Sequence, residues 1–112
     1  MKVEYRTKKL KKQCEDPRLA QKDFGVEIGN RLTKRIRELM AATTLMDIKN
    51  LPSARLHRLE GKRAGQYAVD LVHPHRLVLK PILDEGENIE NLKGITIVMI
   101  EEVTDYHGMQ KR

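Results

Sequence analysis

Aromatic residues and cysteines are scarce in this sequence. It has one Phe, three Tyr and no Trp among 112 residues, so aliphatic side chains must supply most of the core. The single cysteine, Cys14, excludes an internal disulfide and makes a reducing cytoplasm the simplest compartment. No apolar run approaches the roughly 20 residues of a transmembrane helix, and residues 1–5 lack the apolar core of a signal peptide. These shortages predict a cytoplasmic protein that does not enter a membrane.

The sequence also lacks the known motifs for nucleotide and metal sites. It has no P-loop, no GxGxxG and no GxSxG. His73 and His75 lie two residues apart, but no further His or Cys accompanies them at a metal-ligand spacing. Cys14 has no histidine beside it, so we interpret it as a small hydrophobic residue. We therefore expect neither a metal nor a cofactor.

Basic residues are abundant and unevenly distributed along the chain, whose net charge is +6. Residues 82–105 contain seven acidic residues and one basic residue, a net −6, and residues 106–112 add +2, which leaves +10 on residues 1–81. Such a basic body favours a polyanionic partner, or an acidic protein that covers it. The alternative is that Lys and Arg only solvate the outer faces of helices.

The first half of the chain has the pattern of a short strand followed by helices. Residues 2–6 alternate as a strand does, and Thr7 can cap a lysine-rich helix. Asp16-Pro17 predicts the start of a long helix over about 17–42. The apolar stripe of this helix consists of Phe24, Ile28, Leu32, Ile36 and Leu39. Its basic residues fall mostly off the stripe, as a solvated or a binding face: Arg31, Lys34, Arg35 and Arg37.

Two glycines lie within this predicted helix, and a further short turn follows it. Gly25 and Gly29 either weaken the helix or let another segment pack closely against it. Thr43-Thr44 can cap a turn that runs to Asn50, which Leu51-Pro52 then ends.

From Ala54 onward the period of the apolar residues changes from helical to two. The predicted strands span 54–60, 66–72, 75–80 and 95–104, with a loop at 61–65 and an acidic connection at 81–94. Leu77 and Leu79 are expected to face the core, and Arg76, Val78 and Lys80 a second, partly open sheet face. The apolar run of the last strand predicts a central position. This order predicts a single α+β domain over residues 1–112, with an N-terminal strand and two helices packed on a mostly antiparallel sheet of four to five strands.

The last predicted strand ends in three residues that can each hold or move a proton: Asp105, Tyr106 and His107. Cleaving RNA without a metal needs a base for the 2′-hydroxyl, an acid for the 5′-oxygen and cations for the phosphate. His57 is another proton carrier, and Arg63 and Arg76 can grip phosphate oxygens. These residue types alone leave a structural or solvated role open.

Four segments, in this order and spacing, are similar to one protein family. They are Leu56-His57-x-Leu59-x-Gly61, Gly65-Gln66-Tyr67-x-Val69-Asp70, Val72-His73-Pro74-His75-Arg76-Leu77 and Glu102-Val103-x-Asp105-Tyr106-His107. They resemble the RelE/ParE toxin superfamily, and within it the HigB-like "plasmid maintenance killer" branch. With the lysine-rich N-terminal segment, the resemblance covers nearly the whole chain.

This resemblance implies a toxin of a type II toxin–antitoxin system with a RelE-like fold, in which helices pack on a curved sheet. HigB-like toxins enter the ribosomal A site and cut mRNA during translation without a metal. The resemblance therefore implies an mRNA endoribonuclease whose partners are the ribosome, mRNA and a cognate antitoxin of the helix-turn-helix DNA-binding type.

The resemblance also implies site residues. The catalytic residues of the branch correspond to His57, Arg76, Asp105, Tyr106 and His107. The phosphate-binding residues correspond to Arg63, Arg76 and Lys62, and we add Lys80 as an RNA-binding candidate. We expect one histidine to take the 2′-proton and the other, or Tyr106, to protonate the leaving oxygen. Asp105 is expected to orient a histidine or share the base role, and Tyr106 alternatively stacks on a base.

The chain departs from the branch in three places, and two other functions remain open. His75 stands where an aromatic residue is common, the acidic connection is long, and five residues follow His107. One alternative is a non-enzymatic, ParE-like toxin that inhibits DNA gyrase. The other is a catalytically silent homologue whose basic surface only binds its antitoxin.

Overall fold

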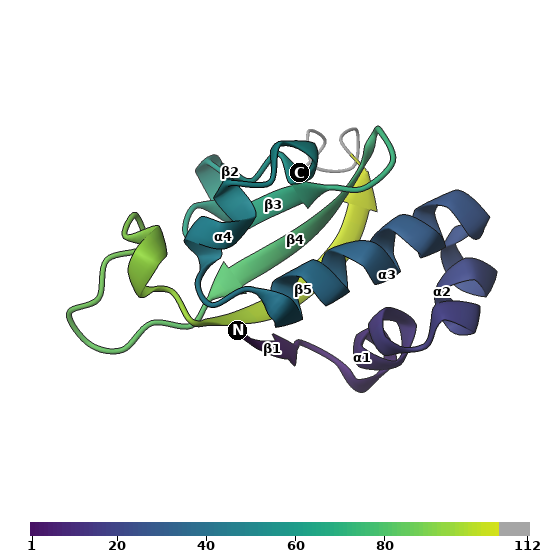
Figure 1. Cartoon of the computed structure of the whole chain (residues 1–112), viewed down its shortest axis with the longest axis horizontal. Helices are drawn as coiled ribbons and strands as arrows, with labels where there is room; N and C mark the ends of the chain where they lie inside the picture. The colour runs from purple at the N-terminus through teal and green to yellow at the C-terminus, as the bar shows by residue number, and fades with distance from the viewer. Residues whose placement is uncertain (106–112) are drawn as a thin grey trace.

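The computed structural model describes residues 1–105, which form an α+β fold (Figure 1). Its helices are α1 (Lys8–Glu15), α2 (Pro17–Phe24), α3 (Val26–Ala41) and α4 (Leu45–Lys49). Its strands are β1 (Lys2–Tyr5), β2 (His57–Arg58), β3 (Tyr67–Asp70), β4 (His75–Pro81) and β5 (Ile97–Asp105). Short 3₁₀ helices span Pro52–Ala54, Gly61–Arg63 and Leu92–Gly94. In this described part, no helix is long and apolar enough to cross a membrane.

The five strands form one sheet in the order β1-β5-β4-β3-β2. Only the β1–β5 pair is parallel, and the other three pairs are antiparallel. The prediction of a mostly antiparallel sheet is therefore confirmed. The apolar last strand, β5, pairs with a strand on both sides, which confirms its inner position.

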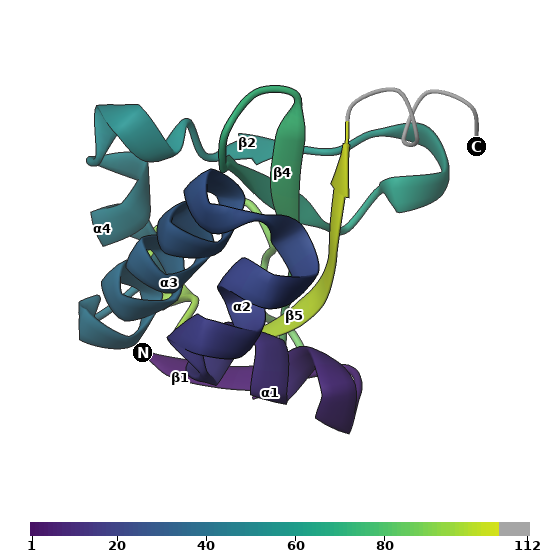
Figure 2. The ribbon, with the colours of Figure 1, turned by 90° about the vertical axis from the view of Figure 1, so that its right-hand side faces the viewer.

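The helices cover one face of this sheet, as the two views in Figures 1 and 2 show. The core between them is aliphatic, as the scarcity of aromatic residues requires, and its largest fully buried apolar side chains are Leu32, Leu39, Leu45, Ile48, Val69, Leu77, Leu79, Ile95, Val98 and Ile100. Burying aliphatic surface of this kind contributes roughly 25 cal/mol per Å² to folding. The layer contains four helices where the sequence pattern indicated two.

The predicted helix starts are present. The Thr7 side chain accepts a hydrogen bond from the Leu10 amide at 3.1 Å. The Asp16 carboxylate accepts from the Arg18 amide at 3.0 Å, with Pro17 in the first turn of α2. Thr44 and Asp47 form a reciprocal capping box that begins α4. Local side-chain chemistry thus sets where these three helices begin.

The single helix predicted over 17–42 is wrong, because the chain breaks at Gly25 into α2 and α3. Gly25 has φ of 90°, a backbone conformation that other residues rarely adopt. The break lets α2 fold back along α3, and Gly29 makes the close approach possible. A Cβ atom on Gly29 would lie 2.6 Å from the backbone nitrogen of Gln21. Both glycines therefore serve the helical hairpin.

A β-bulge interrupts the alternation of β5. Val78 pairs with Glu102 and the next residue, Leu79, pairs with Ile100, so Glu101 is an extra residue on β5. Ile100 and Val103 consequently both pack toward the helices, although they are three residues apart. After the bulge, the residues of β5 that face the helices are the odd-numbered ones, whereas before it they are the even-numbered ones.

The sheet face opposite the helices, hereafter the open face, is less open than its sequence suggested. Val78, expected outward, is fully buried in a small cluster with Leu59 and Ala68. The segment after β2 covers this cluster, and its Arg63 forms an ion pair with Glu102 of β5. The strand predicted over 54–60 is correspondingly shortened to two residues, because Pro52–Ala54 forms a 3₁₀ turn and the residues after Arg58 cross the sheet.

We predict that Gly29→Ala lowers the free energy of unfolding by about 1–3 kcal/mol, because the added methyl group would overlap the α2 backbone. In an uncrowded helix interior the same change would stabilise by up to about 1 kcal/mol, so the sign is diagnostic. Urea denaturation measures the change, with Lys34→Ala on the exposed side of α3 as the control. An unfolding free energy equal to or above that of the wild type would contradict the close packing.

Candidate nuclease site

Four strand ends meet at one end of the sheet, hereafter the site end. β2 begins there at His57, β3 ends at Asp70, β4 begins at His75, and β5 ends at Asp105. Asp70 pairs in register with Arg76, and His75 pairs with Asp105. The antiparallel topology therefore brings His57, Arg76 and Asp105 to one region, although they lie far apart in the sequence.

Strand alternation divides these residues between the two faces of the sheet. His57 pairs with Ala68 and Asp70 pairs with Arg76, and these positions share the open face with Val78. Thr104 is the β5 residue opposite Arg76, so Asp105 and its partner His75 have the alternation of the helix-side residues Leu77 and Leu79. At the site end, Asp105 therefore has the helix-side alternation, whereas His57 and Arg76 have the alternation of the open face.

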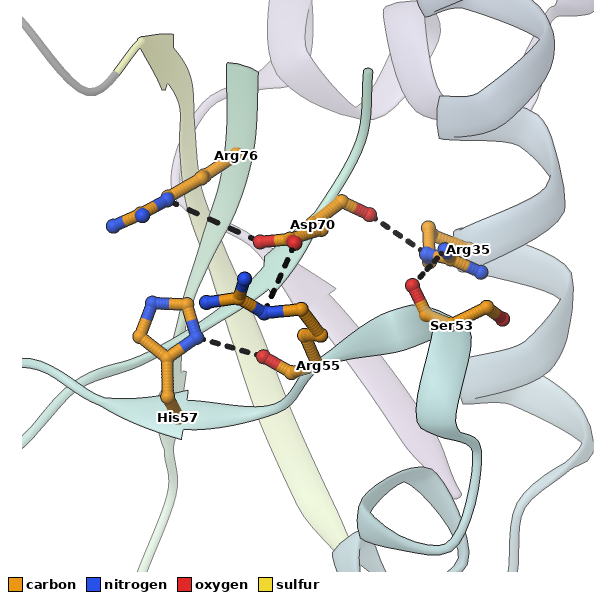
Figure 3. Close-up of polar contacts among 6 residues, drawn as sticks. All are labelled: Arg35, Ser53, Arg55, His57, Asp70 and Arg76. Carbon is orange, nitrogen blue, oxygen red and sulfur yellow. Dashed lines mark hydrogen bonds and ion pairs between the residues drawn. The ribbon is translucent and has the colours of Figure 1, made fainter. Parts of the chain in front are cut away.

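Asp70 forms ion pairs with two arginines on the open face at the site end (Figure 3). Its carboxylate lies 3.3 Å from Nε of Arg55 and 4.0 Å from Nε of Arg76. The Arg76 side chain is only 17% exposed, whereas that of Arg55 is 66% exposed. Arg55, Asp70 and Arg76 together therefore carry an excess of one positive charge.

The imidazole of His57 is fixed by a backbone group. Its Nδ1 lies 2.7 Å from the carbonyl oxygen of Arg55, and because a carbonyl can only accept, Nδ1 must carry the proton. In the neutral ring the other nitrogen, Nε2, then has a free lone pair. Nε2 is shielded from solvent and has no hydrogen-bond partner within the described residues. This is the tautomer that a general base requires.

Arg35 of α3 fastens this cluster to the helical layer, as Figure 3 shows. Its Nε donates to the carbonyl oxygen of Asp70 at 2.7 Å, and one terminal nitrogen donates to the carbonyl oxygen of Ser53, also at 2.7 Å. Its other terminal nitrogen pairs with Glu38 at 2.8 Å. The side chain is 1% exposed, so the interpretation of Arg35 as part of a solvated or binding face is wrong. The free-energy cost of burying this charge is offset because all three partners are present.

The remaining RNA-binding candidates are not gathered with Arg76. Arg63 is neutralised by Glu102, on the part of the open face beside Val78. Lys80 is exposed and shares the open face, but it is four residues from Arg76, which is about 13 Å along a strand. Lys62 is exposed in the 3₁₀ turn after β2. In the part of the chain that the structure describes, none of the three forms an ion pair with Asp70, whose arginine partners are Arg55 and Arg76.

Two of the predicted catalytic residues, Tyr106 and His107, lie outside the described residues. The strand that leads to them ends at the site end, beside the start of β4. Within residues 1–105, no group of three or more His, Cys, Asp or Glu side chains is arranged to hold a metal.

Sequence reasoning gave no role to Arg55 or Asp70. Asp70 belonged to a matching segment, and Arg55 follows the Pro52–Ala54 turn. One available signal was the two-residue spacing of Arg55 and His57, which permits a short-range hydrogen bond from a side chain to the backbone. The pairing of Asp70 with both arginines depends on strand register, which the sequence does not display.

Cys14 is buried and free, as its interpretation as a hydrophobic residue requires. Burial, with a smaller contribution from Glu15, raises the pKa of its thiol to about 12. We predict that the native protein does not react with a thiol reagent such as DTNB at pH 8, since the thiolate is the reactive form. One equivalent should react after urea unfolding. Full reaction of the folded protein within the mixing time would contradict this environment.

For Arg35 we predict that the Arg35→Met variant loses about 3 kcal/mol of unfolding free energy, because two partly buried carbonyls and Glu38 lose their donor. Arg37→Met, on the exposed side of the same helix, is the control and should change stability by about 0.5 kcal/mol or less. Equal stability of the two variants in urea titrations would show that Arg35 does not anchor the cluster.

Comparison with known proteins identifies the fold. No protein-family model and no curated protein sequence matches the chain. Among solved structures, it is similar to YafQ from E. coli strain BL21(DE3), with a TM-score of 0.59, 18% identity, and coverage of 96% of this chain and 94% of that chain. It is also similar to a YoeB/ParE toxin from Agrobacterium tumefaciens, with a TM-score of 0.52, 15% identity, and coverage of 95% and 99%. A YafQ mutant from E. coli gives a TM-score of 0.55 at 19% identity over 96% and 94%. The protein therefore has the fold of the RelE/ParE-like toxins.

Proposed function

We propose that this protein is the toxin of a type II toxin–antitoxin system and acts as a ribosome-dependent, metal-independent mRNA endoribonuclease. The observation that carries the proposal is the open-face cluster, in which a histidine with a free Nε2 lies beside two guanidinium groups that share Asp70. The fold shared with a structure named as a YoeB/ParE toxin supports the biological role.

The chemistry begins at His57. Its Nε2 accepts the proton of an RNA 2′-hydroxyl, and the 2′-oxygen attacks the adjacent phosphate. The backbone carbonyl of Arg55 stabilises the imidazolium that forms, because Nδ1 already donates to it. Arg76 binds the phosphate oxygens as charge accumulates on them. Since Nε2 is shielded, RNA binding has to move the surrounding side chains aside.

The leaving 5′-oxygen needs an acid, and we assign this role to His107 or Tyr106. Asp105, at the end of β5, is proposed to orient His107 or to share the role of base. Its phase on the strand differs from that of Arg76, which favours approach to the substrate from the opposite side of the scissile phosphate. Lys62, Arg63 and Lys80 are proposed to bind flanking phosphates.

The charge distribution suits a ribosomal partner. A body of +10 over residues 1–81 would associate rapidly with an RNA-lined site, with an affinity that falls steeply as salt increases. The same surface suits an antitoxin with an acidic binding segment. We propose that this antitoxin is a helix-turn-helix DNA-binding protein that blocks the open face.

The test maps new 5′ ends on a reporter mRNA in a cell-free translation reaction, with a parallel sample of the same RNA without ribosomes. We expect cuts only on translated mRNA, and a fall of about 100-fold or more in cleavage rate for His57→Ala and His107→Ala, since a proton-transfer residue contributes about 10² to 10⁴. The cleavage rate of the Arg76→Ala variant should fall by a similar factor, because this variant loses a phosphate-binding group.

The control is Arg58→Gln, which removes an arginine from β2 that pairs with Glu90 outside the cluster. Its cleavage rate should stay within about twofold of the wild type, as expected for an exposed ion pair. Cleavage that persists in both histidine variants would overturn the catalytic assignment. If the folded wild type produces no cuts but still arrests growth, the nuclease proposal fails and DNA gyrase becomes the target to test.

A further inference from the structure

Arg55 has a backbone conformation that is unusual for a residue with a Cβ atom. Its φ of 46° and ψ of 54° lie in the left-handed region, and it is the one non-glycine residue with positive φ among residues 1–105. This region disfavours residues with a Cβ, and glycine or asparagine would occupy it at lower free-energy cost. Strain of this kind concentrates at functional sites. The contacts that Arg55 makes in this conformation are therefore the place to look for its function.

The conformation directs two groups of Arg55 toward the same cluster. Its carbonyl oxygen accepts the Nδ1 hydrogen of His57 at 2.7 Å, and its guanidinium lies on Asp70 at 3.3 Å (Figure 3). The residues on either side are fixed, because Ala54 and Leu56 are buried and Arg35 holds the carbonyl of Ser53. Arg55 is thus held in its strained conformation by its neighbours on both sides.

The way Asp70 holds Arg55 leaves most of the guanidinium available. The contact uses Nε, on the inner side of the group, while the side chain remains 66% exposed. A guanidinium has five donors, so its two terminal nitrogens can bind an anion while Nε stays on the carboxylate. Asp70 therefore orients the guanidinium through Nε and leaves the terminal nitrogens of Arg55 to bind a ligand.

Arg58 provides a comparison within the same segment. It is also an exposed arginine paired with a carboxylate, that of Glu90. However, it lies in ordinary strand conformation, and its position next to His57 on β2 places it on the opposite phase of the sheet. An exposed ion pair by itself therefore requires neither a strained backbone nor a link to the histidine.

We propose that Arg55 is a second phosphate-binding residue of the site and, through its backbone carbonyl, the positioning residue of His57. This inference rests on the proposed nuclease function. The guanidinium groups of Arg55 and Arg76, both held through Nε by Asp70, bind the RNA phosphate that is attacked after His57 removes the 2′-proton. The substrate class is therefore single-stranded RNA with its phosphate on the open face between β2 and β4.

Substitutions at Arg55 can distinguish its proposed phosphate binding from its proposed positioning of His57. Arg55→Gly keeps the carbonyl and favours positive φ, so it removes only the guanidinium. Arg55→Lys keeps the charge but loses the fork. Arg55→Val removes the guanidinium and disfavours the left-handed conformation, so it also disturbs His57. Arg58→Gln serves again as the matched control for the loss of one exposed, paired arginine.

The experiment measures single-turnover cleavage of mRNA on programmed ribosomes at saturating protein, over a range of pH, for these variants. We expect Arg55→Gly to be slower by about 100-fold at every pH, with an unchanged pH profile. Arg55→Lys should recover about tenfold of this loss, and Arg55→Val should be slower than Arg55→Gly. ¹⁵N NMR of the His57 ring should report the Nδ1-protonated tautomer in the wild type and in Arg55→Gly but not in Arg55→Val.

Each other outcome counts against the proposal. Arg55→Gly cleaving within twofold of both the wild type and Arg58→Gln would exclude phosphate binding by Arg55. An Arg55→Val variant that keeps the His57 tautomer and the rate of Arg55→Gly would exclude the positioning role. Inactivity of the wild type itself, with the NMR tautomer present, would locate the failure in the proposed nuclease function and remove the inference with it.

Discussion

The buried guanidinium of Arg35 is the interaction on which the site end depends. It reaches from the middle of α3 to the carbonyl of Ser53, before β2, and to the carbonyl of Asp70, at the end of β3. These two segments carry Arg55 and the Asp70 carboxylate, which in turn determine where His57 and Arg76 lie. The helical layer thus fixes the open face through the sheet, by hydrogen bonds that only a long, forked cation can make.

Local chemistry was readable from the sequence, and long-range pairing was not. Thr7, Asp16 and Thr44 predicted helix starts because capping is decided within four residues, and the two-residue period indicated the strands of an α+β fold. Arg35 was misread because an arginine off an apolar stripe is usually solvated, and the two carbonyls that bury it lie 18 and 35 residues away. Asp70 and Arg55 were missed because register and backbone strain leave no mark on residue type.

The two halves of the candidate site differ in how firmly the fold supports them. His57, Asp70 and Arg76 lie on paired strands, where hydrogen bonds and the Leu59–Ala68–Val78 cluster limit movement. The Arg55 side chain, by contrast, is 66% exposed, and its guanidinium is oriented by its ion pair with Asp70. A rigid base beside a more adaptable cation suits a polymer substrate, because the phosphate can be gripped in slightly different positions while the proton acceptor stays fixed.

The bulge at Glu101 separates the requirements of the core from those of the site end. Before it, β5 must direct Val98 and Ile100 toward the helices; after it, the strand follows a phase that those residues do not dictate. Deleting Glu101 would remove the bulge and leave Thr104 opposite Arg76 and Asp105 opposite His75. Regular alternation through Glu101 would instead exchange the faces of Val103, Thr104 and Asp105. The backbone conformation at one extra residue, and not the composition of the buried half of the strand, therefore decides which face of the sheet Thr104 and Asp105 reach.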